Sequence, residues 1–111
     1  MGNSIDNRRK APRYPLVLRV EVTDSISLVN IPARTSDVSR TGCYIDMASP
    51  LPRGSQVQIK LHNGRETFET EAVVRYVSPG LGVGVEFSES TASEKLATLD
   101  RWLATVAKVP V

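Results

Sequence analysis

Two short segments carry the side chains of this chain that are best suited to chemistry. Residues 9–13, Arg-Lys-Ala-Pro-Arg, gather guanidinium groups where a proline disfavours a helix. Residues 37–42, Asp-Val-Ser-Arg-Thr-Gly, have the composition of a turn with a carboxylate, a hydroxyl and a glycine. Guanidinium groups hold phosphate bidentately and stack on bases, and a carboxylate can read a purine edge. The two segments together predict a site for a small phosphate-rich nucleotide. The alternative is that residues 9–13 form a solvated basic arm and that residues 37–42 form an unrelated turn.

Length and composition indicate one ordinary globular domain. The chain has 111 residues and a net charge of +2, which is too small to predict non-specific nucleic-acid binding by itself. The basic residues at the N-terminal end are Arg8, Arg9, Lys10, Arg13 and Arg19. No apolar run is long enough to span a membrane, and no signal peptide precedes the basic cluster, so we expect a cytoplasmic protein without a membrane span.

The apolar pattern predicts a mostly β protein. Every second residue from Tyr14 to Val22 is apolar, as in a half-buried strand. Five further strands are expected over residues 29–36, 43–47, 57–61, 68–77 and 81–87. After Ser88 the period becomes helical, and the apolar stripe consists of Leu96, Leu99, Leu103 and Val106, with Trp102 beside it. Six short strands and one amphipathic helix predict a small antiparallel barrel with the helix packed on it.

Antiparallel pairing of the first two strands would bring the two chemical segments together. Arg13 precedes the first strand and Asp37 follows the second, so both fall at the same end of that hairpin. The N-terminal arm can then fold over the turn and place Arg9 and Arg13 opposite Ser39 and the carboxylate. The simplest explanation for a glycine at position 42 is that its backbone adopts a positive φ angle.

Catalytic functions have little support in the sequence. His62 is the only histidine and falls in a predicted exposed turn, while Cys43 is the only cysteine and begins a strand. These two residues are too few to form a zinc site, and they do not form a plausible nucleophile–base pair for covalent catalysis. The carboxylates are not paired for acid–base work, and no GxxxxGK[ST] phosphate loop is present. We therefore expect no enzyme activity, no metal and no cofactor.

A small basic barrel could also bind single-stranded nucleic acid, which such barrels hold by stacking bases on aromatic side chains. The rings of Tyr14, Phe68, Tyr76 and Phe87 are all expected to face the core, which leaves Tyr44 as the main stacking candidate. Trp102 is expected to pack against the barrel. Nucleic acid is therefore an unlikely partner.

The two segments resemble the RxxxR and [DN]xSxxG motifs of PilZ domains, in the same order and on either side of one hairpin. Residues 82–87, Gly-Val-Gly-Val-Glu-Phe, resemble the closing strand of the PilZ barrel. The resemblance assigns residues 8–107 to a PilZ-like domain, with a flexible leader over residues 1–7 and a tail over residues 108–111. It implies a six-stranded PilZ-type antiparallel barrel with a C-terminal helix.

PilZ domains bind the bacterial second messenger cyclic di-GMP, so the resemblance implies a receptor rather than a catalyst. Arg9 and Arg13 would hold the phosphates and stack on guanine. Asp37 would hydrogen-bond a guanine edge, and Ser39 would support the turn and contact the ligand. Gly42 would keep the surface open to a base. All five motif positions are filled in this chain.

Arg8 is a further binding candidate that the resemblance suggests. In similar domains, an arginine just before the first motif arginine goes with two intercalated molecules of cyclic di-GMP per chain. Binding would order the N-terminal arm and signal to a separate effector protein, whose identity the sequence does not give. The alternatives are a nucleotide-independent adaptor that binds other proteins and, less favoured, a small barrel for single-stranded nucleic acid.

Overall fold

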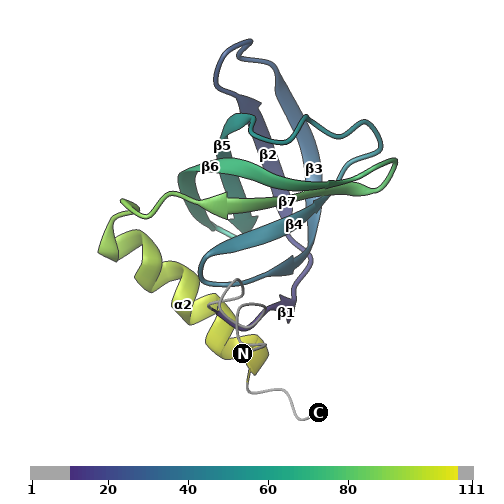
Figure 1. Ribbon diagram of the computed structural model, residues 1–111. Coiled ribbons are helices and arrows are strands. Elements are labelled where there is room, and N and C mark those ends of the chain that lie inside the picture. Colours follow the sequence, from purple (N-terminus) through teal and green to yellow (C-terminus); the bar gives the residue numbers. More distant parts are fainter. Residues whose placement is uncertain (1–10, 108–111) are drawn as a thin grey trace, which may run out of the picture.

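The computed structural model describes residues 11–107, which form a closed antiparallel β-barrel with one helix packed against it (Figure 1). The elements in chain order are β1 (Tyr14–Pro15), β2 (Arg19–Asp24), β3 (Asn30–Val38), β4 (Gly42–Asp46), β5 (Gln56–Asn63), β6 (Glu66–Ser78), β7 (Gly82–Phe87) and α2 (Ser93–Ala107). The sheet order is β1-β3-β2-β5-β6-β7-β4, and pairing of β3 with β4 closes it. The predicted barrel and C-terminal helix are confirmed.

The first predicted strand is divided into β1 and β2, so that β2 to β7 form the predicted six-stranded barrel and β1 is an extra strand paired with β3. The side chain of Thr35 in β3 fills the break: its hydroxyl accepts a hydrogen bond from the Leu18 amide at 2.9 Å and donates one to the Leu16 carbonyl at 2.7 Å. These bonds replace part of the backbone ladder. The alternation of faces survives the break, because Leu18 is buried and Val17 is exposed.

Two β-bulges alter which side chains the barrel presents outward. One lies between Thr35 and Asp37 in β3, and the other lies between Val74 and Tyr76 in β6. A bulge inserts an extra residue and so shifts the inside–outside alternation of its strand. Val74 remains buried, but Tyr76 is 45% exposed. The prediction that Tyr76 faces the core is therefore wrong.

The core contains the aliphatic residues of the inward faces and three aromatic residues, Phe68, Phe87 and Trp102. Phe68 and Phe87 are buried as predicted, with ring centroids 5.3 Å apart. Along α2 the buried residues are Leu99, Trp102 and Leu103, which confirms the apolar stripe and the packing of Trp102 on the barrel.

The alternating strand directions divide the connections between the two ends of the barrel. The turn over residues 39–41 and the β5–β6 hairpin lie at the end that α2 covers, whereas the loops over residues 25–29, 47–55 and 79–81 lie at the opposite end. Figure 1 shows β1 beside α2 and the β2–β3 hairpin projecting from the far end. Within residues 11–107, no helix is both long enough and apolar enough to cross a membrane.

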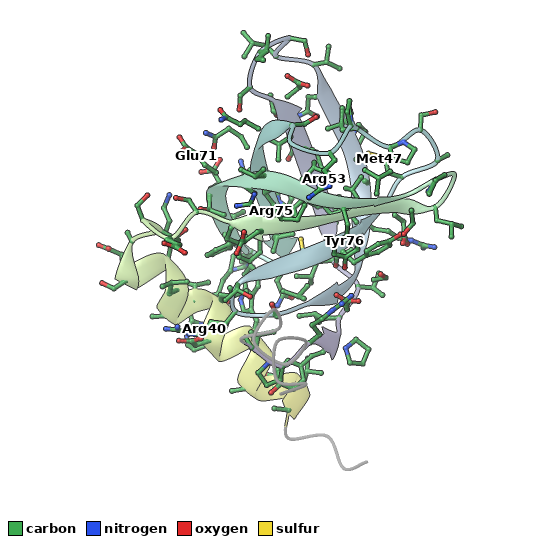
Figure 2. All side chains as sticks on the ribbon, in the orientation of Figure 1. Arg40, Met47, Arg53, Glu71, Arg75 and Tyr76 are labelled. Atoms are coloured by element: carbon green, nitrogen blue, oxygen red, sulfur yellow. The ribbon has the colours of Figure 1, made fainter. Side chains whose placement is uncertain are left out.

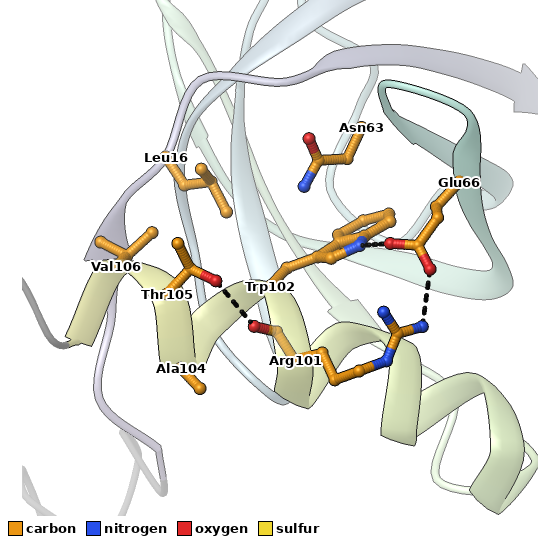
Figure 3. Close-up of a pocket in the computed structure, with 8 residues that line it drawn as sticks. All are labelled: Leu16, Asn63, Glu66, Arg101, Trp102, Ala104, Thr105 and Val106. Carbon is orange, nitrogen blue, oxygen red and sulfur yellow. Dashed lines mark hydrogen bonds and ion pairs between the residues drawn. The ribbon is translucent and has the colours of Figure 1, made fainter.

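Glu66, at the start of β6, fixes α2 to the β5–β6 hairpin (Figure 3). Arg101 donates a hydrogen bond to one carboxylate oxygen at 2.7 Å, and the Trp102 indole donates to the other at 2.8 Å. Because both bonds stabilise the charged form, they hold the pKa of Glu66 below its ordinary value of 4.5. The helix attachment therefore depends on the charge of this carboxylate.

Acid is expected to weaken this attachment. A carboxyl group with a lowered pKa in the folded state contributes its full stabilisation above pH 4.5 and loses it as the pH falls through the folded value. Trp102 is the only tryptophan, so its fluorescence during an acid titration reports the release. Glu66→Gln should flatten this response, and Glu69→Gln, at an exposed position of the same strand, should leave it intact. Identical titrations of the parent and Glu66→Gln chains would contradict the attachment.

Candidate functional site

Arg13 and Asp37 form the centre of the candidate site. Asp37 lies on β3, where it pairs with Pro15 of β1 and with Tyr44 of β4, and Arg13 directly precedes β1. The Arg13 guanidinium meets the carboxylate bidentately, with Nε 3.1 Å from Oδ1 and Nη2 2.7 Å from Oδ2. The two side chains keep 32% and 26% of their surface exposed. The predicted approach of Arg13 to Asp37 is thus confirmed.

The charge of Arg13 is secured by its neighbours. The hydrogen bonds to Asp37 raise the pKa of the Arg13 guanidinium above its ordinary value. The bidentate contact with Asp37 uses two N–H groups of the guanidinium, and arginine has five such donors. The site therefore presents a fixed positive charge with donors left for an anion.

Ser39 holds the turn that follows β3. Its hydroxyl accepts hydrogen bonds from the amides of Thr41 and Gly42 at 3.1 and 3.2 Å, and its own amide donates to the Gly42 carbonyl at 2.8 Å. Ser39 is only 5% exposed. The predicted support of the turn by Ser39 is confirmed, although Asp37 itself belongs to the strand rather than to the turn.

Gly42 is required by strand packing rather than by positive φ. Among residues 11–107, the glycines with positive φ are Gly54, Gly64 and Gly80, so that prediction for Gly42 is wrong. Gly42 is buried at the start of β4, and a Cβ there would overlap the carbonyl oxygen of Val85. The missing side chain thus lets β4 approach β7, which places the turn against the barrel.

Replacement of Gly42 by alanine should therefore destabilise the barrel, by about 1–3 kcal/mol, the usual cost of inserting a methyl group into a packed region. Urea denaturation measures the change, and Thr41→Ala, at the exposed neighbouring turn position, is the control. An unchanged midpoint for Gly42→Ala would mean that β4 and β7 can separate at no cost, contrary to the packing described.

Arg40 connects the same turn to the helix. Its Nε lies 2.9 Å from Oδ1 of Asp100 in α2. On the other side of the turn, the Thr41 carbonyl accepts a hydrogen bond from the Phe87 amide at 2.8 Å. The turn is thus held by both β7 and α2. The sequence pattern carried no sign of the Arg40 contact, because it joins residues far apart in the chain.

Two aromatic residues lie beside the Arg13–Asp37 pair: Tyr44, the predicted stacking candidate, and Tyr76, which was predicted to face the core. Tyr44 in β4 and Tyr76 in β6 have ring centroids 6.1 Å apart and an interplanar angle of 29°. Figure 2 labels Tyr76 and its chain neighbour Arg75, and the register shift of β6 lies between Val74 and Tyr76. Glycines at alternate positions of β7 were the available sequence signal, because they allow a large side chain to lie over the strand. The remaining candidates, Arg8 and Arg9, lie outside the described residues.

The geometry gives no support to catalysis by Cys43 or His62. Burial raises the pKa of the Cys43 thiol well above its ordinary value, which keeps it protonated. His62 lies in β5 rather than in an exposed turn, so its predicted location is wrong. Its Nε2 is 2.6 Å from Oε2 of Glu21 on the neighbouring strand. The two residues thus stand in separate environments, Cys43 in the core and His62 hydrogen-bonded to Glu21 across two strands.

A pocket of about 650 Å³ lies apart from Arg13 and Asp37, under the C-terminal half of α2 (Figure 3). It is lined by Leu16, Asn63, Glu66, Arg101, Trp102, Ala104, Thr105 and Val106. The polar contacts of Glu66 in this pocket already bind the helix, so we assign the pocket to the packing of α2.

The barrel, its C-terminal helix and the paired motif residues define a PilZ domain. The chain matches the PilZ domain family over residues 7–105 and belongs to that family. PilZ domains are binding domains rather than enzymes.

Solved structures share the fold at low sequence identity. The PilZ domain of Escherichia coli YcgR, solved with c-di-GMP, has a TM-score of 0.74 and 16% identity, and the match covers 91% of this chain and 92% of that one. The inhibitor of motility MotI/DgrA of Bacillus subtilis has a TM-score of 0.74 and 22% identity, with 93% and 54% covered. The PilZ domain of CeSA from a cellulose-synthesizing bacterium has a TM-score of 0.67 and 18% identity, with 86% and 98% covered.

The chain therefore spans about half the length of MotI/DgrA. No curated protein has a sequence that matches this one. At these identities, the structural likeness establishes the fold and leaves the ligand to be argued from the site.

Proposed function

We propose that this PilZ domain is a receptor for cyclic di-GMP, which it binds on the surface around Arg13 and Asp37. The observation that carries the proposal is the bidentate pair itself, since it joins the last arginine of the RxxxR motif to the first residue of the DxSxxG motif. Ser39 and Gly42 complete the second motif, and Arg8 and Arg9 would approach from the arm. Support also comes from family membership and from the YcgR PilZ domain solved with c-di-GMP.

The chemistry of the pair suits a guanine dinucleotide. The free N–H groups of Arg13 can donate to phosphate oxygens, and the flat guanidinium can stack on a base. The carboxylate of Asp37 retains lone pairs outside its contacts with Arg13, and it can accept from the N1–H and amino groups on the edge of guanine. Because the two side chains orient each other before ligand arrives, little ordering is needed at this point of the site.

Signalling would follow from the arm that carries Arg8 and Arg9. In the proposed mechanism, these arginines clamp the phosphates and the N-terminal segment docks on the barrel, which changes the surface that a separate effector protein meets. If two intercalated ligand molecules bind, the guanidinium groups of Arg8 and Arg9 could each stack on a guanine base. Phosphate binding by several arginines also implies that affinity falls as salt concentration rises.

Loss of the Arg13 guanidinium should reduce affinity for cyclic di-GMP by about 10- to 100-fold, the usual range for a charged hydrogen-bonding group. Calorimetric titration of Arg13→Ala against the parent measures the change and the stoichiometry. Arg53→Ala is the matched control, because it removes the same charge from a loop at the opposite end of the barrel. Equal affinities for the parent and Arg13→Ala would exclude this site.

Replacement of Asp37 by alanine should act on base selection more than on phosphate attraction. We expect the preference for cyclic di-GMP over cyclic di-AMP to shrink in Asp37→Ala, measured by competition in the same titration.

Absence of any binding by the parent chain would favour the nucleotide-independent adaptor. Displacement of cyclic di-GMP by a single-stranded oligonucleotide at equal concentration would favour the nucleic-acid barrel.

A further inference from the structure

Four residues form a row across the outer surface of the barrel, starting at the proposed site. Asp37 of β3 pairs with Tyr44 of β4, Tyr44 pairs with Gly84 of β7, and Gly84 pairs with Tyr76 of β6. Adjacent strands are about 4.8 Å apart, so the row extends roughly 14 Å from the carboxylate. It is long enough to lie under a nucleotide that begins at Asp37.

The tyrosine of β6 lies directly over the glycine of β7. A Cβ on Gly84 would overlap the ring atoms Cζ and Cε2 of Tyr76. The phenol end of the ring therefore rests on the bare backbone of β7, and one face of the ring is covered by that backbone. The side chain nevertheless keeps 45% of its surface exposed. This exposure must come from the side that turns away from the barrel.

The tyrosine of β4 extends the same aromatic surface. A Cβ on Gly82 would lie 2.9 Å from Cε2 of Tyr44, closer than real contacts allow, so this ring also depends on a glycine of β7. With an interplanar angle of 29° to Tyr76, the two rings lie nearly parallel. We call Tyr44 and Tyr76, on their glycine floor, the tyrosine surface.

The tyrosine surface is joined to the charged pair through Asp37. The guanidinium of Arg13 hydrogen-bonds the Asp37 carboxylate, and Asp37 pairs with Tyr44 across β3 and β4. The residues that would hold the phosphates and the guanine edge therefore adjoin an exposed aromatic face. Such a face binds planar bases whatever their identity, because every base has a π-face.

The geometry points to the tyrosine surface as a stacking platform for a purine base, with Tyr76 the principal contact. The occupant is a base of the same cyclic di-GMP molecule whose phosphates meet Arg13, so the inference rests on the proposed function. Beyond that function, it assigns a binding role to two tyrosines outside both motifs. It also gives Gly82 and Gly84 a purpose, which is to let the rings lie flat enough for a base to cover them.

A purely structural role for Tyr76, as a cover for the Gly84 backbone, makes a different prediction. An aromatic ring over a strand glycine can stabilise a sheet without binding anything. Leucine would still cover the glycine but could not stack on a base. Phenylalanine would cover the glycine and stack, losing only the hydroxyl. The two substitutions therefore separate covering from stacking.

We expect Tyr76→Leu to weaken cyclic di-GMP binding by about 5- to 100-fold, the range measured for loss of one stacked base. Tyr76→Phe should bind within about threefold of the parent, since the ring is retained. Ile26→Ala removes an exposed apolar side chain from the loop over residues 25–29, at the other end of the barrel, and should change nothing. Calorimetry supplies the affinities, and thermal unfolding checks that each variant is folded.

Proton NMR of the tyrosine rings provides a readout that a structural role would not change. A base stacked on Tyr76 should move its ring proton resonances upfield when cyclic di-GMP is added. If the parent chain binds and Tyr76→Leu binds equally well, or if the ring resonances stay in place, the stacking role is wrong and the receptor proposal stands. If the parent chain does not bind cyclic di-GMP, both fail.

Discussion

The two β-bulges are the constraint on which the exposed site depends. In a regular strand, each outward side chain is followed by an inward one, so regular alternation along β6 would point Tyr76 into the core. The bulge before Tyr76 sends this ring outward while Val74 stays buried. The bulge before Asp37 similarly ends the regular alternation of β3. Closure of the barrel fixes both bulges, because each strand must pair with a neighbour on either side.

Glycines make the second contribution, by removing side chains where backbones and rings approach closely. Gly42 allows β4 to meet β7, and this contact places the motif turn against the barrel. Gly84 allows Tyr76 to lie over the same strand. The hydroxyl of Ser39 then holds the turn from inside. The resulting site carries the Arg13–Asp37 ion pair beside a turn held by hydrogen bonds.

Much of this arrangement follows from the sequence. Alternation identified the strands, the stripe on α2 identified its buried face, and antiparallel pairing was enough to bring Arg13 to Asp37. Each of these inferences uses spacing along one strand, helix or hairpin. The features that were missed depend on contacts between distant segments. They are the bulge at Tyr76, the hydrogen bonds by which the Thr35 hydroxyl replaces backbone pairing, and the hydrogen bonds from α2 to Glu66. No local pattern encodes them, because closure of the barrel decides where they fall.

The most direct test of the receptor account is a titration of the isotopically labelled chain with cyclic di-GMP, followed by amide NMR. The account predicts saturable shifts at Arg13 and across residues 37–42, with the loop over residues 25–29 unchanged because it lies at the opposite end of the barrel. Shifts confined to that loop, or no shifts at millimolar ligand, would contradict it.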